Sequence, residues 1–359
     1  MDKIYIEDCC EILDSMRIPI TASDREEGPY PYYGANGIQD HVADYIFDDE
    51  LVLLAEDGGN FGSKERPIAY RVSGKCWVNN HAHVLKPKEG LDVDYLCYSL
   101  MFYNVDNMVN GATRQKLTQA AMRKMMIPKR NLDEQKDIVN KLNKVVEIKR
   151  KRQIELDELD NLIKSRFVEL FGDPEKNTFS WKEQALSEHL TVIGGYAFNS
   201  EQFSEEGIPV LRIGNINSGF FKPVNLVCWE DDDALSRYKM YPGDLVMSLT
   251  GTVGKDDYGN VCILGNDYAV YYLNQRNAKL ELQDTLNKYY LAMLLKFESV
   301  KKQLTGISRG VRQANISNKD ILNLSVQIPP MELQIQFEEF VHQVDKLKFL
   351  IQRKEIKQP

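Results

Sequence analysis

The sequence of 359 residues contains no apolar run that approaches the roughly 20 residues needed to span a bilayer. Its first ten residues carry three acids and one lysine, a composition that does not match a secretory signal peptide. Its six cysteines include no Cys-x-x-Cys pair, which argues against a thiolate metal site or a redox motif. We therefore expect a cytoplasmic protein whose cysteines are reduced, scattered and buried.

Motifs for catalysis are also missing. Thr250–Lys255, TGTVGK, has too few residues between its glycines for a phosphate-binding loop, and Gly58–Lys64, GGNFGSK, has the required residues in the wrong order. No N-P-P-Y methyltransferase motif or P-D…E-x-K nuclease pattern occurs, and the five histidines form no clear Ser/His/Asp arrangement. We expect a chain without catalytic residues, in which these glycines form tight loops at equivalent strand ends.

Cys76, His81 and His83 suggest a metal site. Two histidines at alternate positions of a strand place both rings on one face, but no second pair of ligands occurs elsewhere in the sequence. Strand residues without a metal role are the better interpretation. Trp77–Leu85, which contains both histidines, is therefore predicted to be a single strand, and we expect no metal.

The second half of the sequence repeats the first. Trp77–Leu85 resembles Tyr272–Leu280 at an offset of 195 residues, and the same offset aligns Tyr95 with Tyr290. Further along the chain the offset grows to 201, where Ile127 aligns with Ile328, Pro128 with Pro329, and Gln135 with Gln336. Solenoid repeats have periods of roughly 20 to 50 residues, so this longer repeat predicts a duplicated domain.

A long helix is expected between the two copies. Leu132–Phe171 contains neither glycine nor proline, and Asn131 with Glu134 forms the pattern of a capping box. Its apolar residues follow a heptad seam, and Gly172 provides a stop. Forty helical residues would make a rod of roughly 60 Å. A second apolar stripe, Phe337–Ile351, predicts a shorter C-terminal helix that pairs with the first in antiparallel orientation.

These elements predict an α+β fold: two similar domains, related by pseudo-two-fold symmetry and joined by two long antiparallel helices in a coiled coil. The predicted order is a first domain at 1–130, a central helix at 131–172, a second domain at 173–328 and a C-terminal helix at 329–359. Two similar but unequal domains suggest one molecule that reads two different half-targets.

The charge distribution favours nucleic acid as a partner more than the net charge of −8 does. Asn110–Arg130 and Val300–Lys319 contain several lysines and arginines but no acid. They lie at equivalent places in the two repeats, which an ordinary solvated surface would not require. The alternative is that both stretches are simply exposed helix and loop surface.

Loops that mix arginine, glutamine, asparagine and glycine occur in both stretches, as GATRQK at Gly111–Lys116 and GISRGVRQAN at Gly306–Asn315. Arginine can read guanine and glutamine or asparagine can read adenine, while serine, threonine and backbone amides can hold phosphates. Surface turns with polar caps are the alternative for any single loop. The candidate DNA contacts are Tyr33, Asn36, Asn60, Lys64, Asn80, Thr113, Arg114, Gln115, Lys116, Arg212, Asn215, Asn217, Thr252, Lys255, Gln275, Arg276, Ser308, Arg309, Arg312, Gln313 and Asn315.

Several segments in order resemble one known family. The first copy contributes PYYGANGI, GATRQ and IPKRNLDEQ, the helix exit contributes LFGDP, and the second copy contributes GIPVLRIGNI, GDLV, VRQANI and IPP. Each segment is weakly specific alone, but their order and their duplication around two long helices are specific. The chain resembles the specificity subunit of type I restriction–modification systems over nearly its whole length.

The resemblance implies that each domain recognises one half of a split, asymmetric target in double-stranded DNA, and that the helices set the gap between the halves. It also implies that the helices bind two modification subunits, and that a restriction or motor subunit can join them. S-adenosylmethionine, ATP and Mg²⁺ would belong to those partners, and this chain would carry no cofactor and contact no membrane. Alternatives are a coiled-coil scaffold with two peptide- or protein-binding domains, and a self-contained nuclease.

Overall fold

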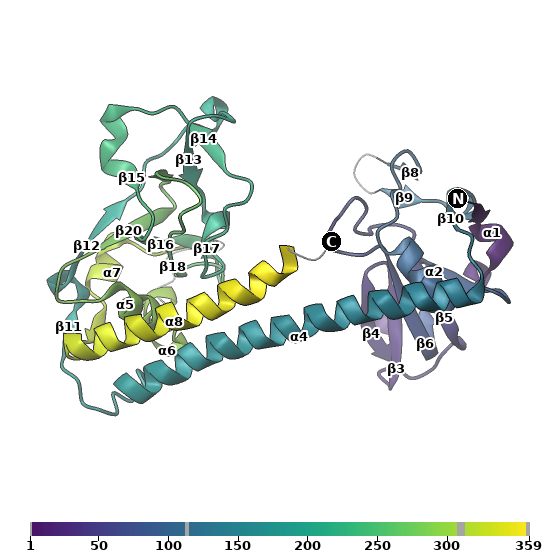
Figure 1. Ribbon diagram of the computed structural model, residues 1–359, viewed down its shortest axis with the longest axis horizontal. Helices are drawn as coiled ribbons and strands as arrows, with labels where there is room; N and C mark the ends of the chain where they lie inside the picture. The colour runs from purple at the N-terminus through teal and green to yellow at the C-terminus, as the bar shows by residue number, and fades with distance from the viewer. Residues whose placement is uncertain (1, 112–114, 307–312, 357–359) are drawn as a thin grey trace. The chain divides into compact units, whose positions relative to one another are not determined.

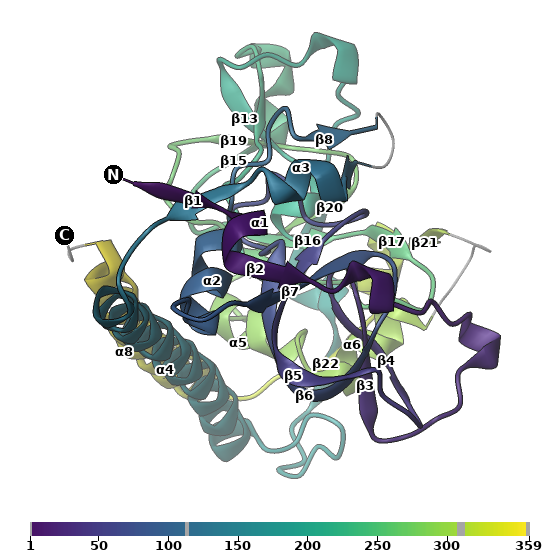
Figure 2. The same cartoon turned by 90° about the vertical axis from the view of Figure 1, so that its right-hand side faces the viewer.

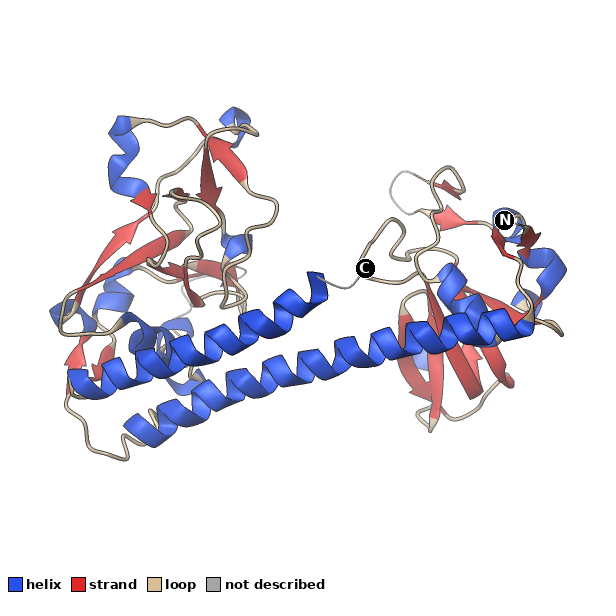
Figure 3. Cartoon of the chain, in the orientation of Figure 1, coloured by secondary structure: helices blue, strands red, loops and turns tan. Residues whose placement is uncertain are grey.

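The computed structural model describes residues 2–111, 115–306 and 313–356. The chain divides into two compact units, Met1–Lys151 and Arg152–Pro359, each built from strands and helices (Figure 3). The boundary falls inside the long helix α4, Leu132–Phe171. The domain limits expected from the sequence therefore stay a prediction. In the described part of the chain, no helix is both long and apolar enough to cross a membrane.

Unit 1 is organised around a six-stranded sheet in the order β2-β7-β5-β6-β3-β4. Neighbouring strands are antiparallel except β3 and β6, which pair in parallel with Tyr32 opposite Trp77. The central strand β5 ends in a run, 51–55, that is fully buried because apolar clusters cover both faces of the sheet. The sheet strands are β2 Cys10–Ile12, β3 Tyr30–Gly34, β4 Gly37–Val42, β5 Phe47–Ala55, β6 Ala69–Val78 and β7 Ala82–Pro87.

The other elements of unit 1 are short. A two-stranded sheet joins β1 near the N-terminus to β10, which directly precedes α4. The helix α2 packs on the apolar cluster that also contains residues of β5 and β7. These elements are β1 Lys3–Tyr5, α1 Ile6–Cys9, η1 Asp14–Met16, η2 Ala22–Asp24, α2 Val93–Leu100, β8 Val109–Asn110, β9 Lys116–Leu117, α3 Gln119–Arg123 and β10 Met126–Pro128.

Unit 2 contains two four-stranded sheets, ordered β12-β20-β16-β18 and β14-β13-β19-β15. Two further pairs, β11 with β22 and β17 with β21, complete its described strands. The strands are β11 Glu183–Ala185, β12 Leu190–Gly194, β13 Ile208–Leu211, β14 Val227–Trp229, β15 Lys239–Met240, β16 Leu245–Ser248, β17 Thr250–Thr252, β18 Val261–Ile263, β19 Tyr271–Leu273, β20 Asn277–Leu282, β21 Gln313–Asn315 and β22 Ser325–Gln327. The helical elements are η3 Leu186–Glu188, η4 Ser200–Gln202, η5 Ile213–Asn215, η6 Asp233–Tyr238, α5 Lys288–Leu294, α6 Glu298–Thr305 and α7 Asn318–Leu322.

The prediction of one strand at Trp77–Leu85 is wrong. β6 ends at Val78 and β7 begins at Ala82, and the residues between them form a turn. Asn79 is buried there because its side-chain amide bonds Gln39 and its oxygen accepts the His81 amide. The equivalent run in unit 2 is likewise divided between β19 and β20. Similar sequence therefore indicated equivalent positions correctly, but not a continuous strand.

The two long helices run antiparallel where they meet in unit 2 (Figure 1). Phe171 and Phe167 of α4 contact Phe337 near the start of α8, Met331–Ile356, whereas Asp160 pairs with Lys348 further along it. Phe167 also stacks on Tyr290 at 5.3 Å between ring centroids, which joins the helical pair to the core of the unit. The predicted capping box at the start of α4 is present as well, since Asn131 and Glu134 exchange hydrogen bonds.

Matching hydrogen bonds show which residues of the two units are equivalent. The hydroxyl of Tyr95 donates to Pro128 O at 2.9 Å, and that of Tyr290 donates to Gln327 O at 2.8 Å. Thr118 caps α3 and Ser317 caps α7 in the same way. These pairs give an offset of 199 in this region, so the predicted offset of 201 is wrong by two residues. Pro128 ends strand β10, whereas Pro329 lies beyond the end of β22.

A buried glutamine anchors the first turn of each long helix to its own unit. Gln135 accepts from Asp92 N at 2.8 Å and donates to Gly90 O, while Gln334 accepts from Asn287 N at 2.8 Å and donates to Pro329 O. Both side chains are almost fully buried. The partner of Gln135 in the repeat is therefore Gln334, not the predicted Gln336, which is exposed.

We expect Gln334→Ala to lower the free energy of unfolding by about 1–3 kcal/mol, because a partly buried Asn287 N–H would lose its acceptor. Gln336→Ala is the matched control, and its effect should stay within about 0.5 kcal/mol because the side chain is exposed. Urea denaturation followed by circular dichroism measures both. Equal losses in the two variants would contradict the equivalence of Gln135 and Gln334.

Candidate nucleic-acid interface

In unit 1, loops from three parts of the sequence meet at one end of the large sheet. Asn36, in the turn between β3 and β4, donates to Gly58 O at 3.0 Å. Asn60 donates to the side-chain oxygen of Asn36 at 3.1 Å, so the turn and the loop after β5 are joined directly. Strand β9 reaches the same loop through an antiparallel bridge between Lys116 and Asp57. The structure therefore brings three of the predicted contact segments together.

The remaining predicted residues of unit 1 differ in accessibility. Lys64, Asn80 and Gln115 are exposed and free to meet a ligand. Tyr33 is half-buried against Tyr70, at 5.8 Å between ring centroids, and burial raises the pKa of its hydroxyl. Thr113 and Arg114 lie outside the described residues.

In unit 2, the short strands β17 and β21 bring two predicted segments side by side (Figure 2). Thr252 pairs with Gln313, and Thr250 pairs with Asn315. The Thr252 amide and hydroxyl both donate to the carboxylate of Asp257, which closes the loop tightly and leaves Lys255 exposed in its turn. Ser308, Arg309 and Arg312 lie outside the described residues.

Further predicted residues surround this pair of strands. Gln275 and Arg276 are exposed in the turn between β19 and β20, and the Arg276 carbonyl accepts the Leu249 amide. Arg212 is exposed and donates to Asn225 O. The Asn217 carbonyl accepts the side-chain amide of Asn260, which joins its turn to the loop after β17.

The side chain of Asn215 is bonded within the protein rather than exposed to a ligand. Its side chain is buried, donates to Lys222 O and Val224 O at 2.9 Å, and accepts the Arg212 amide at 3.0 Å. The same donors and acceptor that would recognise adenine are therefore used by the backbone. Its position indicates that it shapes the loop, and that its neighbour Arg212 is the accessible residue.

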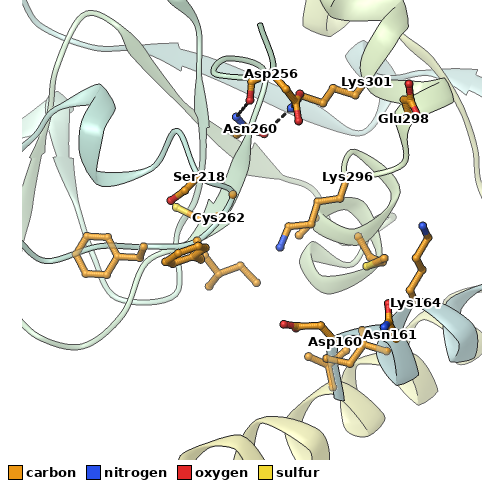
Figure 4. A pocket seen from close by; sticks show the side chains of 18 of the residues that line it. Asp160, Asn161, Lys164, Ser218, Asp256, Asn260, Cys262, Lys296, Glu298 and Lys301 are labelled. Carbon is orange, nitrogen blue, oxygen red and sulfur yellow. Dashed lines mark hydrogen bonds and ion pairs between the residues drawn. The ribbon is translucent and has the colours of Figure 1, made fainter. Parts of the chain in front are cut away.

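Lys301 is a buried cation that the sequence did not single out. It lies on α6, and its ammonium pairs with Asp256 and donates to Asn260 Oδ1 at 2.6 Å (Figure 4). Because Asn260 also holds Asn217, this one lysine ties two candidate loops to the body of unit 2. Its spacing from Leu304 on α6 matches a buried helix face, and that is the only signal the sequence offers for it.

The histidines do not form the suggested site with Cys76. Cys76 lies in an apolar cluster of the sheet, and His81 pairs with Asp57 at 2.7 Å. His83 is fully buried, with Nδ1 at 2.7 Å from Asp14 Oδ2 and Nε2 at 2.8 Å from Leu117 O.

Asp14, Glu56 and His83 nevertheless place three potential metal ligands within 4.8 Å of one another. Two cations already occupy the carboxylate of Glu56, since Arg17 binds Oε2 at 2.6 Å and Lys116 binds Oε1 at 2.9 Å. Asp14 accepts from the Val84 amide and from Gln119. A divalent cation would have to displace these donors and lie beside two positive charges, so the donor set fits an ionic network better than a metal centre.

The network keeps both carboxylates ionised. Burial alone would raise the pKa of Asp14, but the hydrogen bond and charge of His83, with the Val84 amide, lower it below 3.8. Burial also opposes ionisation of Glu56, and hydrogen bonds from Arg17 and Lys116 outweigh it, so this pKa is lowered below 4.5. The two carboxylates therefore stabilise the fold in their charged forms.

A hollow lies within unit 2, between the helical pair and the body of the unit. It has a volume of about 1650 Å³, and its lining includes Asp160, Phe337 and Lys296, with Lys255 among the predicted contacts (Figure 4). Burial lowers the pKa of the Lys296 ammonium, although the acidic groups nearby oppose this shift. Apolar side chains and both signs of charge share this lining, whereas phosphates are bound through lysine and arginine.

We expect the extra stability that Asp14 provides to depend on pH. Its folded-state pKa is lowered, so the stabilisation is complete above the ordinary value of 3.8 and is lost as pH falls through the lower, folded-state pKa. Urea denaturation between pH 3 and pH 7 should show the difference between the wild type and Asp14→Asn shrinking at the acidic end. Asp106→Asn, at an exposed position, is the control. A difference that stays constant over this range would disprove the role of the carboxylate charge.

Comparison with known proteins gives one consistent family. The family described as type I restriction modification DNA specificity domain matches residues 1–158 and 180–358. A putative type I restriction enzyme specificity subunit of Haemophilus influenzae is 28% identical over 341 residues, which cover 92% of this chain and 83% of the relative. The MjaVIII specificity subunit of Methanocaldococcus jannaschii is 24% identical over 390 residues, 99% of this chain and 88% of the relative.

Two solved structures share the fold. The S subunit of a type I restriction–modification system from M. genitalium aligns with a TM-score of 0.56 at 14% identity, over 98% of this chain and 91% of that one. A chain from a study of complex assembly and conformational transition of the type I R-M system aligns with a TM-score of 0.52 at 16% identity, over 99% of this chain and 94% of that one. The family match spans nearly the whole sequence, and this chain belongs to the type I restriction–modification DNA specificity family.

Proposed function

We propose that this protein is the sequence-specific DNA-binding subunit of a type I restriction–modification system and recognises a bipartite, asymmetric target. The observation that carries the proposal is the repeated loop arrangement. In each unit, the loop after an equivalent strand, β5 or β16, is bonded to the segment before an equivalent short helix, α3 or α7. Both arrangements present accessible lysine, arginine, asparagine or glutamine side chains.

These side chains suit the two tasks of a DNA reader. Lysines such as Lys116 and Lys255 can neutralise phosphates, which gives affinity that depends on salt. Amide and guanidinium groups such as those of Asn315 and Arg276 can pair with base edges in the major groove. Because the two units carry different residues on these loops, each would read a different half-target. Two modest half-site affinities on one chain then combine into tight binding.

The partners follow from the family. We propose that two modification subunits dock on the long helices and supply methyl transfer from S-adenosylmethionine, and that a restriction subunit can add ATP- and Mg²⁺-dependent cleavage. This chain would then be a recognition subunit without catalytic residues, acting on DNA in the cytoplasm. A scaffold for peptides is less favoured, because it would not need basic loops at equivalent places in both units.

We expect Lys116→Ala to weaken binding to one half-site and Asn315→Ala to weaken binding to the other. Loss of one phosphate contact should reduce the slope of log affinity against log salt by about 0.9, and loss of one base contact should cost about 1–3 kcal/mol of discrimination. Fluorescence anisotropy with duplexes altered in one half-site measures both effects. The target comes from sequencing methylated DNA of cells that express the chain with its modification subunit.

Lys141→Ala is the control for these variants, since Lys141 lies exposed on α4 and pairs with Asp137 of the same helix. It should leave half-site preference unchanged. If both loop variants bind every duplex as the wild type does, the assignment of the loops to DNA is wrong. A chain that shows no salt-sensitive DNA binding would instead favour the scaffold.

We expect the length of α4 to set the gap between the half-sites. Deleting residues 141–147 removes about 10.5 Å of helix, close to three base pairs of DNA, and turns the rest of the helix by only about 20° from its original phase. Sequencing of methylated DNA should then show unchanged half-sites with a shorter gap. Replacing the same seven residues with alanine is the control that keeps the length. Altered half-sites with an unchanged gap would disprove this role of the helix.

A further inference from the structure

The ionic network of Asp14, Glu56 and His83 occurs in unit 1 alone among the described residues. Strand registers establish the equivalent positions. His83 lies opposite Leu54 in the pairing of β7 with β5, and Ala278 lies opposite Met247 in the equivalent pairing of β20 with β16. Unit 2 therefore has an alanine, fully buried, where unit 1 has the histidine.

The two carboxylates are replaced as well. Leu117 N donates to Glu56 O at 2.7 Å and Ile316 N donates to Leu249 O at 2.8 Å, so Leu249 is the counterpart of Glu56. Gly194 pairs with Ala278, which makes it the counterpart of Asp14 beside His83.

The same backbone connection thus forms with and without the charges. In unit 2, small and apolar side chains surround the bond between Leu249, directly after β16, and Ile316, directly after β21. The network stabilises unit 1, but unit 2 forms the same backbone connection without one. Buried charges are costly unless they are paired, so a set that this connection does not require points to another use.

At the surface above the network, unit 1 has Lys116 at a position where unit 2 has no lysine. Its counterpart is Asn315, because Leu117 corresponds to Ile316. The Lys116 ammonium lies 2.9 Å from Glu56 Oε1, and its side chain is 49% exposed, whereas Glu56 is buried. Arg17 holds the other oxygen of Glu56 at 2.6 Å and is itself held by Ala82 O at 2.8 Å. Lys116 is therefore attached to a fixed carboxylate rather than to a mobile one.

His83 and Asp14 fix the backbone beside this lysine. Both ring nitrogens of His83 lie within hydrogen-bond distance of oxygen atoms, Asp14 Oδ2 and Leu117 O, so the ring connects the buried carboxylate to the backbone next to Lys116. Asp14 also accepts from Gln119, two residues beyond Leu117. Arg17 and Lys116 both bind Glu56, and Lys116 is the more exposed of the two, so its charge is the one that a ligand can reach.

We propose that Asp14, Glu56 and His83 are positioning residues that hold the Lys116 ammonium in place for a phosphate of the half-site read by unit 1. The inference rests on the proposed function and goes beyond it, because it makes the two half-sites electrostatically unequal. Unit 1 uses a fixed cation at a position where unit 2 has a neutral amide. At this position, unit 1 therefore makes a salt-dependent phosphate contact that its counterpart in unit 2 does not make.

The test uses the full chain and a duplex that carries its methylation target, with anisotropy measured over a series of NaCl concentrations. The variants are Glu56→Leu, which copies unit 2, Glu56→Gln, which keeps the shape, Lys116→Ala, and the double variant Glu56→Gln with Lys116→Ala. Glu65→Gln, at an exposed position of the same loop, is the control. Thermal unfolding identifies any variant that fails to fold. If Glu56→Leu fails to fold, Glu56→Gln still decides the test.

We expect Lys116→Ala to lower the salt slope by about 0.9 and the Glu56 variants to lower affinity several-fold at low salt. The double variant should lose no more than Lys116→Ala alone, since Glu56 acts through the lysine. Additive losses, Glu56 variants that bind as tightly as the wild type, or a Lys116→Ala variant without effect would each overturn the inference while leaving the proposed function intact. A wild-type chain that does not prefer its target over a scrambled duplex would overturn the proposed function itself.

Discussion

The buried glutamine in the first turn of each long helix is the interaction on which the architecture depends. A buried backbone N–H must find an acceptor, and the acceptable geometry is narrow. By accepting the amide of a helix N-cap and donating to a carbonyl, Gln135 and Gln334 fix where each long helix begins and hold its first turn against its own unit. Such a junction suits the proposed role of α4 as a spacer, because a loose start would make the length of the helix irrelevant.

The helices could be predicted from the sequence because local rules determine them. Leu132–Phe171 has no glycine or proline and a complete capping box, and these features act within one or two turns. The offset of 201 was wrong because it rested on identical residues at Ile328 and Pro329. The true offset follows from hydrogen bonds to partners far away in the sequence, which identical residues do not reveal. The prediction of one strand at Trp77–Leu85 was wrong because Asn79 lies in a turn that is held by a hydrogen bond to Gln39, which is far away in the sequence.

The candidate site was predicted at the level of loops and less well at the level of residues. An amide that can read a base can equally satisfy a carbonyl, and sequence does not distinguish the two, as buried Asn215 demonstrates. Lys301 makes the same point for cations, since it belongs to a basic stretch yet holds loops together from inside. Which polar side chains face a ligand depends on burial, and burial is decided by tertiary packing.

The divergence of the two units is constrained by electrostatics as well as by recognition. A lone carboxylate at Glu56 would be buried without a partner, and a lone Arg17 would be equally unfavourable. The unit 1 set and the set of Gly194, Leu249 and Ala278 are both self-consistent, whereas single exchanges between them remove a hydrogen-bond partner from a buried polar group. Such positions therefore change together, while the exposed loop residues above them can change one at a time. Half-site specificity would then vary quickly at the surface, while the buried set beneath the loops would change only as a whole.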